Sequence, residues 1–358
     1  MSASDLLLVL FAALPLLLLV LFASIVRAYR AVAERGTALL VAGNVTLTLS
    51  LLSLLLAGGE VYYRFFYDES DGFQLSKVGL RWTERHYRRN NFDIRDNIDY
   101  TTNKTDQRTR VTFVGDSYTN GYGIVDVNER FANVLRAANP GWEVHVLAED
   151  GLDTGPLLGT LSRRLDSGYQ IDCVVYAYVL NDISDLVGEW QETARRVYNE
   201  KPGFLWEHSY LLNTYYYRFK ATHDPQLAGY FDYVAAAYAD ATWEHQRRRL
   251  GKLADLVARH EGRLVVVTFP FFELMEDERY RRVHDQLAAF WAEQGIPHID
   301  LLDLYRRYPM DQLIVNRYDT HPNALAHELA AREMQGFIER QTAPAVSVRV
   351  PEKKKPGP

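Results

Sequence analysis

Four residues of this chain lie where apolar runs break into polar segments: Ser117, Gly151, Asn181 and His321. A serine hydroxyl is a weak nucleophile, so it needs exposure and an adjacent base such as a histidine. A glycine lets the backbone approach a ligand closely and aim an N–H at it. An asparagine side chain can donate a hydrogen bond to a developing oxyanion. These residue types suit the cleavage or transfer of an acyl group.

Each of these residues also has an ordinary structural interpretation when it is taken alone. Ser117 lies in RVTFVGDSYTNGYG, residues 110–123, where a G-D-S sequence after a strand is also a common turn. Gly151, in EDGLDTG, suits a loop that needs a positive φ. Asn181 and Asp182 suit a turn at the end of a strand. The single motifs therefore leave a structural role open.

The histidine has a more specific sequence context. In YDTHPNALAH, His321 alone among the ten histidines has an acid two positions before it and a proline after it. In an extended segment, residues two apart project to the same side, so Asp319 can orient the imidazole. Asn323 is expected to cap the final helix. Three other histidines fall on predicted helix or strand-edge positions and are expected to be structural or surface groups: His284, His298 and His327.

The elements that must position these residues follow a strand–helix alternation. Predicted strands cover residues 110–114, 143–147, 173–179, 263–269 and 297–299, and predicted helices cover 129–138, 155–165, 233–260, 281–294 and 323–340. This alternation predicts an α/β fold with a central parallel sheet covered by helices on both faces. In such sheets ligands bind beyond the carboxyl ends of the strands, where the four residues are expected to meet.

Composition and charge restrict the class of protein. The 358 residues are 47% hydrophobic and 24% charged, as in a globular chain. A net charge of −6 argues against nucleic-acid binding, which needs a basic face. The single cysteine, Cys173, lies in an apolar run and predicts a buried thiol. There is no CxxC or His-rich tract, so neither a metal site nor another cofactor is expected.

Two apolar runs near the N-terminus predict transmembrane helices at about residues 6–26 and 37–57. Each is long enough to cross a hydrocarbon core of about 30 Å. A cleaved signal peptide is the alternative for the first run, but the run is too long and MSASD carries no Lys or Arg. Polar residues in the second run are candidates for hydrogen bonds to the first: Asn44, Thr46, Thr48, Ser50 and Ser53.

The positive charges between these runs predict the orientation in the membrane. The loop RAYRAVAERG carries Arg27, Arg30 and Arg35, whereas GGEVYYRFFYDESDG after the second run is net acidic. The positive-inside rule then places the loop in the cytoplasm. Both termini and the remaining domain are expected on the periplasmic or extracellular side of the cell (inner) membrane. Five aromatic residues are expected to form a belt at the outer interface: Tyr62, Tyr63, Phe65, Phe66 and Tyr67.

The order Ser, Gly, Asn, His resembles the blocks of the SGNH, or GDSL-type, hydrolase superfamily over residues 110–340. The resemblance implies a flavodoxin-like three-layer α/β/α fold, with Ser117 as nucleophile, His321 as general base and Asp319 orienting the base. It also implies an oxyanion hole made by the N–H groups of Ser117 and Gly151 and by the Asn181 side chain. Asp116 and Asp182, the acids of the first and third blocks, are expected to support the site structurally.

Other positions match or depart from the family pattern. NNFDIRD resembles an N-x-x-G-x-R-D stretch of membrane-anchored members through Asn90, Arg95 and Asp96, with Asp93 in the place of glycine. The third block usually reads G-x-N-D, but Val179 holds the glycine position. The last block is commonly D-x-x-H, whereas here Tyr318 lies three residues before the histidine.

The predicted organisation has four parts. A membrane hairpin covers residues 1–67, a connector 68–109, the SGNH-like domain 110–341 with an insert at about 183–230, and a disordered tail 342–358. The polar connector has no clear period and is expected to pack along the domain. The insert is rich in aromatic residues, and its periodicity is weak. The tail is rich in proline and lysine.

Three functions fit these observations. The first is a membrane-anchored serine esterase acting on an O-acyl ester of an extracytoplasmic glycan or lipid. The second is an O-acyltransferase that uses the same residues to acetylate an envelope polysaccharide, with a membrane partner supplying the acyl donor. The third is a non-catalytic binding or scaffold protein, in which aromatic residues would stack on sugars: Trp190, Trp206, Tyr215, Tyr216 and Tyr217.

Overall fold

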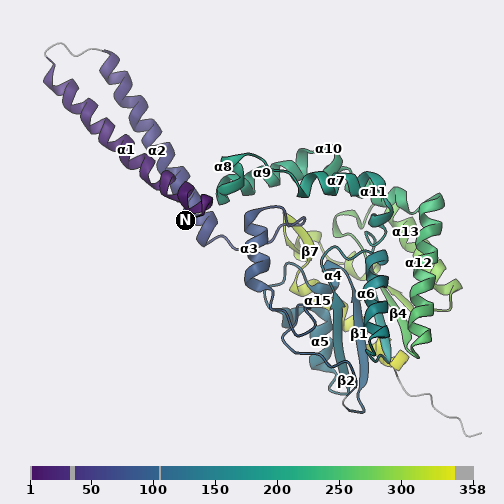
Figure 1. Ribbon diagram of the computed structural model, residues 1–358. Coiled ribbons are helices and arrows are strands. Elements are labelled where there is room, and N and C mark those ends of the chain that lie inside the picture. The colour runs from purple at the N-terminus through teal and green to yellow at the C-terminus, as the bar shows by residue number, and fades with distance from the viewer. Residues whose placement is uncertain (1, 33–36, 105, 343–358) are drawn as a thin grey trace, which may run out of the picture.

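The computed structural model describes residues 2–32, 37–104 and 106–342 (Figure 1). Arg35 of the predicted cytoplasmic loop and the predicted tail beyond residue 342 lie outside the described residues. The described chain consists of a long helical hairpin at the N-terminus and an α/β domain (Figure 1).

The α/β domain is built on a parallel sheet, as the strand–helix alternation predicts. Within the described residues the sheet has five strands in the order β2-β1-β3-β4-β5. Their bounds are β1 Thr109–Gly115, β2 Trp142–Ala148, β3 Cys173–Val179, β4 Arg263–Phe269 and β5 His298–Asp300. Helices α5 (Phe131–Ala138) and α15 (Ala324–Thr342) pack together on one side, and α6 (Thr154–Asp166) and α12 (Asp240–Arg259) on the other (Figure 1). The predicted three-layer α/β/α fold is confirmed.

The central strand shows why this sequence forms a covered parallel sheet. All seven residues of β3, CVVYAYV, are buried, which a strand covered on both faces requires. Cys173 is part of this core, and burial raises the pKa of its thiol to about 12. The strand order reverses between β1 and β3, so the carboxyl ends of these two strands border the crevice in which such sheets bind ligands.

The N-terminal hairpin consists of α1 (Ala3–Ala31) and α2 (Thr37–Phe65). Both helices are long and apolar enough to cross a membrane, and each extends beyond the predicted span. Ser50 donates a hydrogen bond to the Pro15 carbonyl of α1 at 3.2 Å, as expected for a polar residue of the second run. Thr46 and Ser53 instead bond to carbonyls of α2 itself.

The end of α2 is fixed to the α/β domain by buried polar contacts. The Glu60 carboxylate is fully buried and accepts hydrogen bonds from the Ser209 hydroxyl at 2.6 Å and the Tyr210 and Leu211 N–H groups at 2.9 and 3.0 Å. A negative charge is stabilised at this helix N-terminus, which begins α9 (Tyr210–His223). Arg81 donates to the Tyr63 carbonyl at 3.0 Å and to carbonyls of the next turn.

Two regions that lack a clear periodicity in the sequence are helical. The connector contains α3 (Lys77–His86). The insert and the residues after it form α7 (Gly188–Tyr198), α8 (Phe204–His208), α9, α10 (Pro225–Ala228) and α11 (Tyr230–Ala237). These helices run as a row across the top of the domain from the base of the hairpin (Figure 1). Two further helices, α13 (Glu278–Glu293) and α14 (Leu302–Tyr305), flank β5 in the sequence.

The single helix predicted for residues 233–260 is wrong, because the chain breaks between α11 and α12. Asp240 begins α12 with a φ of +49°, which a continuous helix does not allow. Just before the break, the buried Tyr238 hydroxyl bonds to the Leu180 carbonyl at 2.7 Å and to the Tyr178 hydroxyl at 2.6 Å. These tertiary contacts outweigh the local helical pattern.

A buried ionic cluster joins the connector to the first βα unit. The Asp96 carboxylate is fully buried and contacts Arg130 at 3.1 Å and Arg136 at 2.6 Å. Burial would raise its pKa, but the hydrogen bond from Arg136 and the charges of both arginines hold the pKa well below its usual range. Arg130 and Arg95 also donate to backbone carbonyls of the turn after β1. The cluster therefore supports the segment that carries Ser117.

Asp96→Asn is expected to lower the free energy of unfolding by about 3–5 kcal/mol, because it leaves Arg130 buried without its counter-charge. Thermal unfolding of the full chain in detergent measures this loss. Asp106→Asn is the control, since Asp106 pairs with Arg108 at the surface. An unfolding midpoint of Asp96→Asn equal to that of Asp106→Asn would contradict the assigned role.

Candidate active site

Ser117 lies at the turn between β1 and the short helix α4 (Ser117–Asn120). Asp116 caps this helix and accepts a hydrogen bond from the Tyr118 N–H at 3.0 Å. The turn requires Gly115, because a Cβ there would lie 2.8 Å from the Ala177 carbonyl oxygen of β3. The sharp turn presents the serine at the carboxyl end of the sheet, where it lines a cavity.

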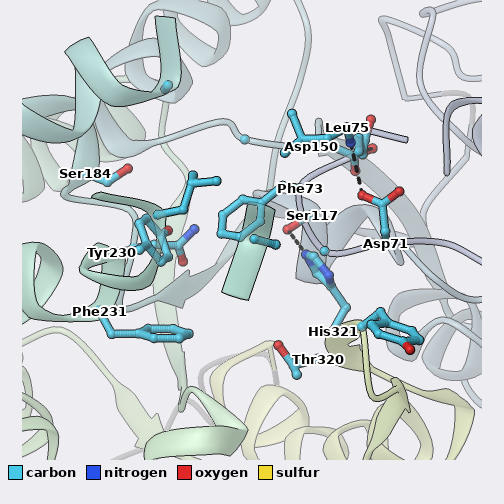
Figure 2. A pocket seen from close by; sticks show the side chains of 18 of the residues that line it. Asp71, Phe73, Leu75, Ser117, Asp150, Ser184, Tyr230, Phe231, Thr320 and His321 are labelled. Atoms are coloured by element: carbon cyan, nitrogen blue, oxygen red, sulfur yellow. Dashed lines mark hydrogen bonds between the residues drawn. The ribbon is translucent and has the colours of Figure 1, made fainter. Parts of the chain in front are cut away.

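His321 reaches Ser117 from a separate pair of short strands, β6 (Ile314–Asn316) and β7 (Asp319–Pro322). Its Nε2 lies 2.9 Å from the Ser117 Oγ, across 204 positions of sequence (Figure 2). Its Nδ1 lies 2.5 Å from the Asp319 Oδ1. The two residues are two apart on an extended strand and face the same side. Serine, histidine and aspartate thus form one chain of hydrogen bonds.

This chain of hydrogen bonds can move a proton. If Nδ1 donates to the buried Asp319 carboxylate, Nε2 is left to accept the proton of the Ser117 hydroxyl. Burial lowers the pKa of His321, but the charge of Asp319 and its hydrogen bond outweigh burial and raise it above the ordinary 6.5. The arrangement therefore suits an imidazole that acts as a general base.

The pH dependence follows from this raised pKa. A general base works only when it is neutral, so kcat/KM is expected to fall as the pH drops through the pKa of His321. The midpoint of this acid limb should lie above 6.5. It can be measured from the rate of p-nitrophenyl ester hydrolysis between about pH 5 and about pH 9. As the control for stability, the protein is returned to the starting pH and its activity is measured again. An acid limb centred below 6.5 would contradict the assignment.

Gly151 and Asn181 lie in the loops after β2 and β3 and line the same cavity as Ser117 and His321. Gly151 has a φ of +73°, a conformation that favours glycine. The Asn181 Nδ2 lies 3.4 Å from the Asp116 Oδ2, and an amide NH₂ group carries a second hydrogen that can serve a ligand. The structure thus brings the four chemically interesting residues of the sequence into one cavity.

Asp116 and Asp182 lie beneath this group and are almost fully buried. Burial raises the pKa of Asp116 to about 6, against the opposing effects of the Tyr118 N–H and the charge of His321. The Asp182 carboxylate accepts a hydrogen bond from the Tyr176 hydroxyl at 2.7 Å, and burial together with Asp116 raises its pKa well above the ordinary value. The Asp182 carboxylate also accepts from the Val179 N–H at the end of β3, at 3.4 Å.

The cavity above Ser117 has a volume of about 660 Å³. Its walls come from the insert, from the loop after β4 and from the segment that follows α2. The side chains that give it an apolar, mostly aromatic lining are Phe73, Leu75, Trp190, Ala194, Tyr198, Leu227, Tyr230, Phe231 and Phe271. Phe73, Tyr230 and Phe231 lie together on one side of Ser117 (Figure 2). Of the aromatic residues considered for sugar stacking, Trp190 and Tyr217 line the cavity, whereas Tyr215 stacks with Tyr63 and Trp206 with Tyr216.

Residues 67–76, here called the juxtamembrane segment, form part of this site, although the sequence analysis treats them only as the end of the hairpin and the start of a connector. Asp71 lines the cavity next to Ser117 and His321 (Figure 2), and Ser70 contacts Asp319. The local sequence YDESDGFQLS is polar and turn-like. It contains no pattern that relates it to residues almost 250 positions away.

No family model matches the chain, and no curated protein matches it. Among solved structures, the chain is similar to a member of the lipolytic protein G-D-S-L family from Veillonella parvula, with 16% identity and a TM-score of 0.41 over 65% of this chain and 99% of the other. It is similar to an extracellular lipase from Streptomyces rimosus, with 16% identity and a TM-score of 0.41 over 63% and 99%. It is also similar to a salicylyl-acyltransferase from a tetracycline biosynthetic pathway, with 14% identity and a TM-score of 0.34 over 66% and 57%.

Proposed function

We propose that the protein is a membrane-anchored serine esterase that cleaves an O-acyl ester of a glycan or lipid outside the cytoplasm. The observation that carries this proposal is the chain of hydrogen bonds from Ser117 through His321 to Asp319, which opens into a cavity with an aromatic wall on one side. A hydroxyl, an imidazole and a buried carboxylate in this order are the parts that acyl-enzyme chemistry needs.

The proposed reaction has two stages. The Ser117 Oγ attacks the carbonyl carbon of the ester while His321 Nε2 takes the hydroxyl proton. The N–H groups of Ser117 and Gly151 and the Asn181 side chain stabilise the oxyanion. The tetrahedral intermediate collapses, and the alcohol leaves with the proton from His321, so that an acyl-serine remains. Water then gives up a proton to His321 and attacks the acyl-serine. The second tetrahedral intermediate collapses and releases the carboxylic acid, while His321 returns the proton to the Ser117 Oγ.

The cavity supports an acyl group longer than acetyl. Its volume of about 660 Å³ lies in the range of sites that hold whole small-molecule ligands, so it has room for an acyl group longer than acetyl together with part of the alcohol. The aromatic lining beside Ser117 favours burial of an apolar chain by the hydrophobic effect. The two long apolar helices support a location at a membrane, and Arg27 and Arg30 near the end of α1 support an outward-facing domain.

The test uses the full chain in detergent with p-nitrophenyl esters of increasing acyl length and with acylated glycans. We expect labelling by a fluorophosphonate and hydrolysis that is fastest for an acyl chain longer than acetyl. Transfer to a glycan acceptor that outpaces hydrolysis would instead identify an O-acyltransferase with a membrane partner as donor. Absence of both labelling and turnover, together with glycan binding, would favour the non-catalytic alternative.

A further inference from the structure

The juxtamembrane segment places a buried hydroxyl against the acid of the site. Ser70 has only 1% of its surface exposed, and its hydroxyl donates a hydrogen bond to Oδ2 of Asp319. The other carboxylate oxygen, Oδ1, accepts from His321 through both Nδ1 and the backbone N–H. Among the described residues, Ser70 is the hydrogen-bond donor to Oδ2. The two oxygens of Asp319 thus have separate partners.

Backbone contacts hold Ser70 in this position. The Gly72 N–H donates to the Tyr318 carbonyl at 2.9 Å, and the Asn316 side chain donates to the Ser70 carbonyl at 3.4 Å. The Tyr122 hydroxyl donates to the Asp71 carbonyl at 2.9 Å. The juxtamembrane segment therefore runs alongside the turn that joins β6 to β7.

The neighbouring Asp71 side chain takes part in other hydrogen bonds and not in one to Asp319. Its carboxylate accepts hydrogen bonds from the Leu75 N–H at 3.0 Å, the Ser76 N–H at 3.3 Å and the Ser76 hydroxyl at 2.5 Å. Asp71 thus stabilises the turn into α3. Only Ser70 connects the juxtamembrane segment to the carboxylate of Asp319 through a side chain in the described part of the chain.

We propose that Ser70 is a positioning residue of the catalytic site, which fixes the Asp319 carboxylate so that Oδ1 faces His321. Asp319 is fully buried, so without the Ser70 hydroxyl its Oδ2 would lack a hydrogen bond. The carboxylate would then rotate toward another donor, and the imidazole would lose its orientation. Ser70 follows the last residue of α2 by five positions, so the chain that leaves the hairpin completes the site. This inference rests on the proposed esterase function.

The test compares Ser70→Ala with the full chain in steady-state hydrolysis of a p-nitrophenyl ester. Without the Ser70 hydroxyl the Asp319 carboxylate can turn away from the His321 Nδ1, so kcat is expected to fall by about 10- to 100-fold. KM should stay unchanged, because Ser70 is not among the residues that line the cavity. Ser70→Thr keeps the hydroxyl and should restore most of kcat. Ser53→Ala is the control, since Ser53 is buried but bonds only to the Ser50 carbonyl of α2.

Different outcomes separate the two proposals. If the unmodified chain neither hydrolyses esters nor reacts with a fluorophosphonate, the esterase function fails. If the unmodified chain is active and Ser70→Ala has the same kcat, the positioning role fails. A raised KM with a lowered unfolding temperature and no rescue by Ser70→Thr would also overturn it. Should Ser70→Ala not fold, Ser70→Cys has nearly the same shape but a weak donor, and equal kcat for the Cys and Thr variants would again refute the role.

Discussion

Ser117→Ala is expected to abolish covalent labelling by a fluorophosphonate and to lower ester hydrolysis by about 10⁴- to 10⁶-fold. The Ser117 Oγ is the atom that the His321 Nε2 faces at 2.9 Å, and alanine removes it while leaving the cavity and the backbone of α4 in place. The loss should therefore appear in kcat, with the unfolding temperature little changed.

The experiment combines gel detection of the labelled chain with steady-state hydrolysis. Ser162→Ala is the matched control, because Ser162 lies half-buried on α6, outside the cavity, and its hydroxyl donates a hydrogen bond to Asp166 of the same helix. Labelling of this variant should equal that of the unmodified chain. Labelling that persists in Ser117→Ala would show that another residue is the nucleophile.

Asp319→Asn is expected to lower kcat by about 10²- to 10⁴-fold. The carboxylate keeps a proton on His321 Nδ1 and stabilises the imidazolium that forms when Ser117 loses its proton. An amide lacks the charge, and it can offer its NH₂ group to Nδ1 and so favour the wrong tautomer. This prediction also tests whether Asp319, which lies two residues before His321, serves as the acid of the site.

The same variant should change the pH profile. The negative charge of Asp319 is the largest cause that raises the pKa of His321, so its removal lowers that pKa. The imidazole then stays neutral to lower pH, and the acid limb of the residual activity should move to lower pH. Asp311→Asn is the control, since Asp311 is exposed. A kcat within about twofold of the unmodified chain would exclude Asp319 from catalysis.

The sequence was sufficient to predict the sheet and the meeting of Ser117 with His321. Continuous apolar strands such as β3 can only be covered on both faces, and the loops at the carboxyl ends of parallel strands lie at one edge. The sequence therefore predicts that Ser117 and His321 lie close together although they are 204 positions apart.

The sequence could not predict the features that depend on contacts between distant segments. The amphipathic pattern of the insert is weak in α9, because the buried residues of that helix are the polar Asn213 and Thr214 and its N-terminus is held by the Glu60 carboxylate of α2. The break before Asp240 depends on the hydrogen bonds of Tyr238 to the end of β3. Ser70 lies 249 positions from Asp319, and neither local sequence indicates the other.

The joint between α2 and the α/β domain has a mechanical consequence. Glu60 fixes the end of the hairpin to the start of α9, and Arg81 of α3 binds the carbonyls at the end of α2, so the domain is held close to the hairpin at two points. For a hairpin inserted in a bilayer, the height of Ser117 above the lipid surface is then a constant of the fold. An esterase held in this way would not search through the space outside the membrane. It would meet only those esters that diffuse within one thin layer parallel to the bilayer.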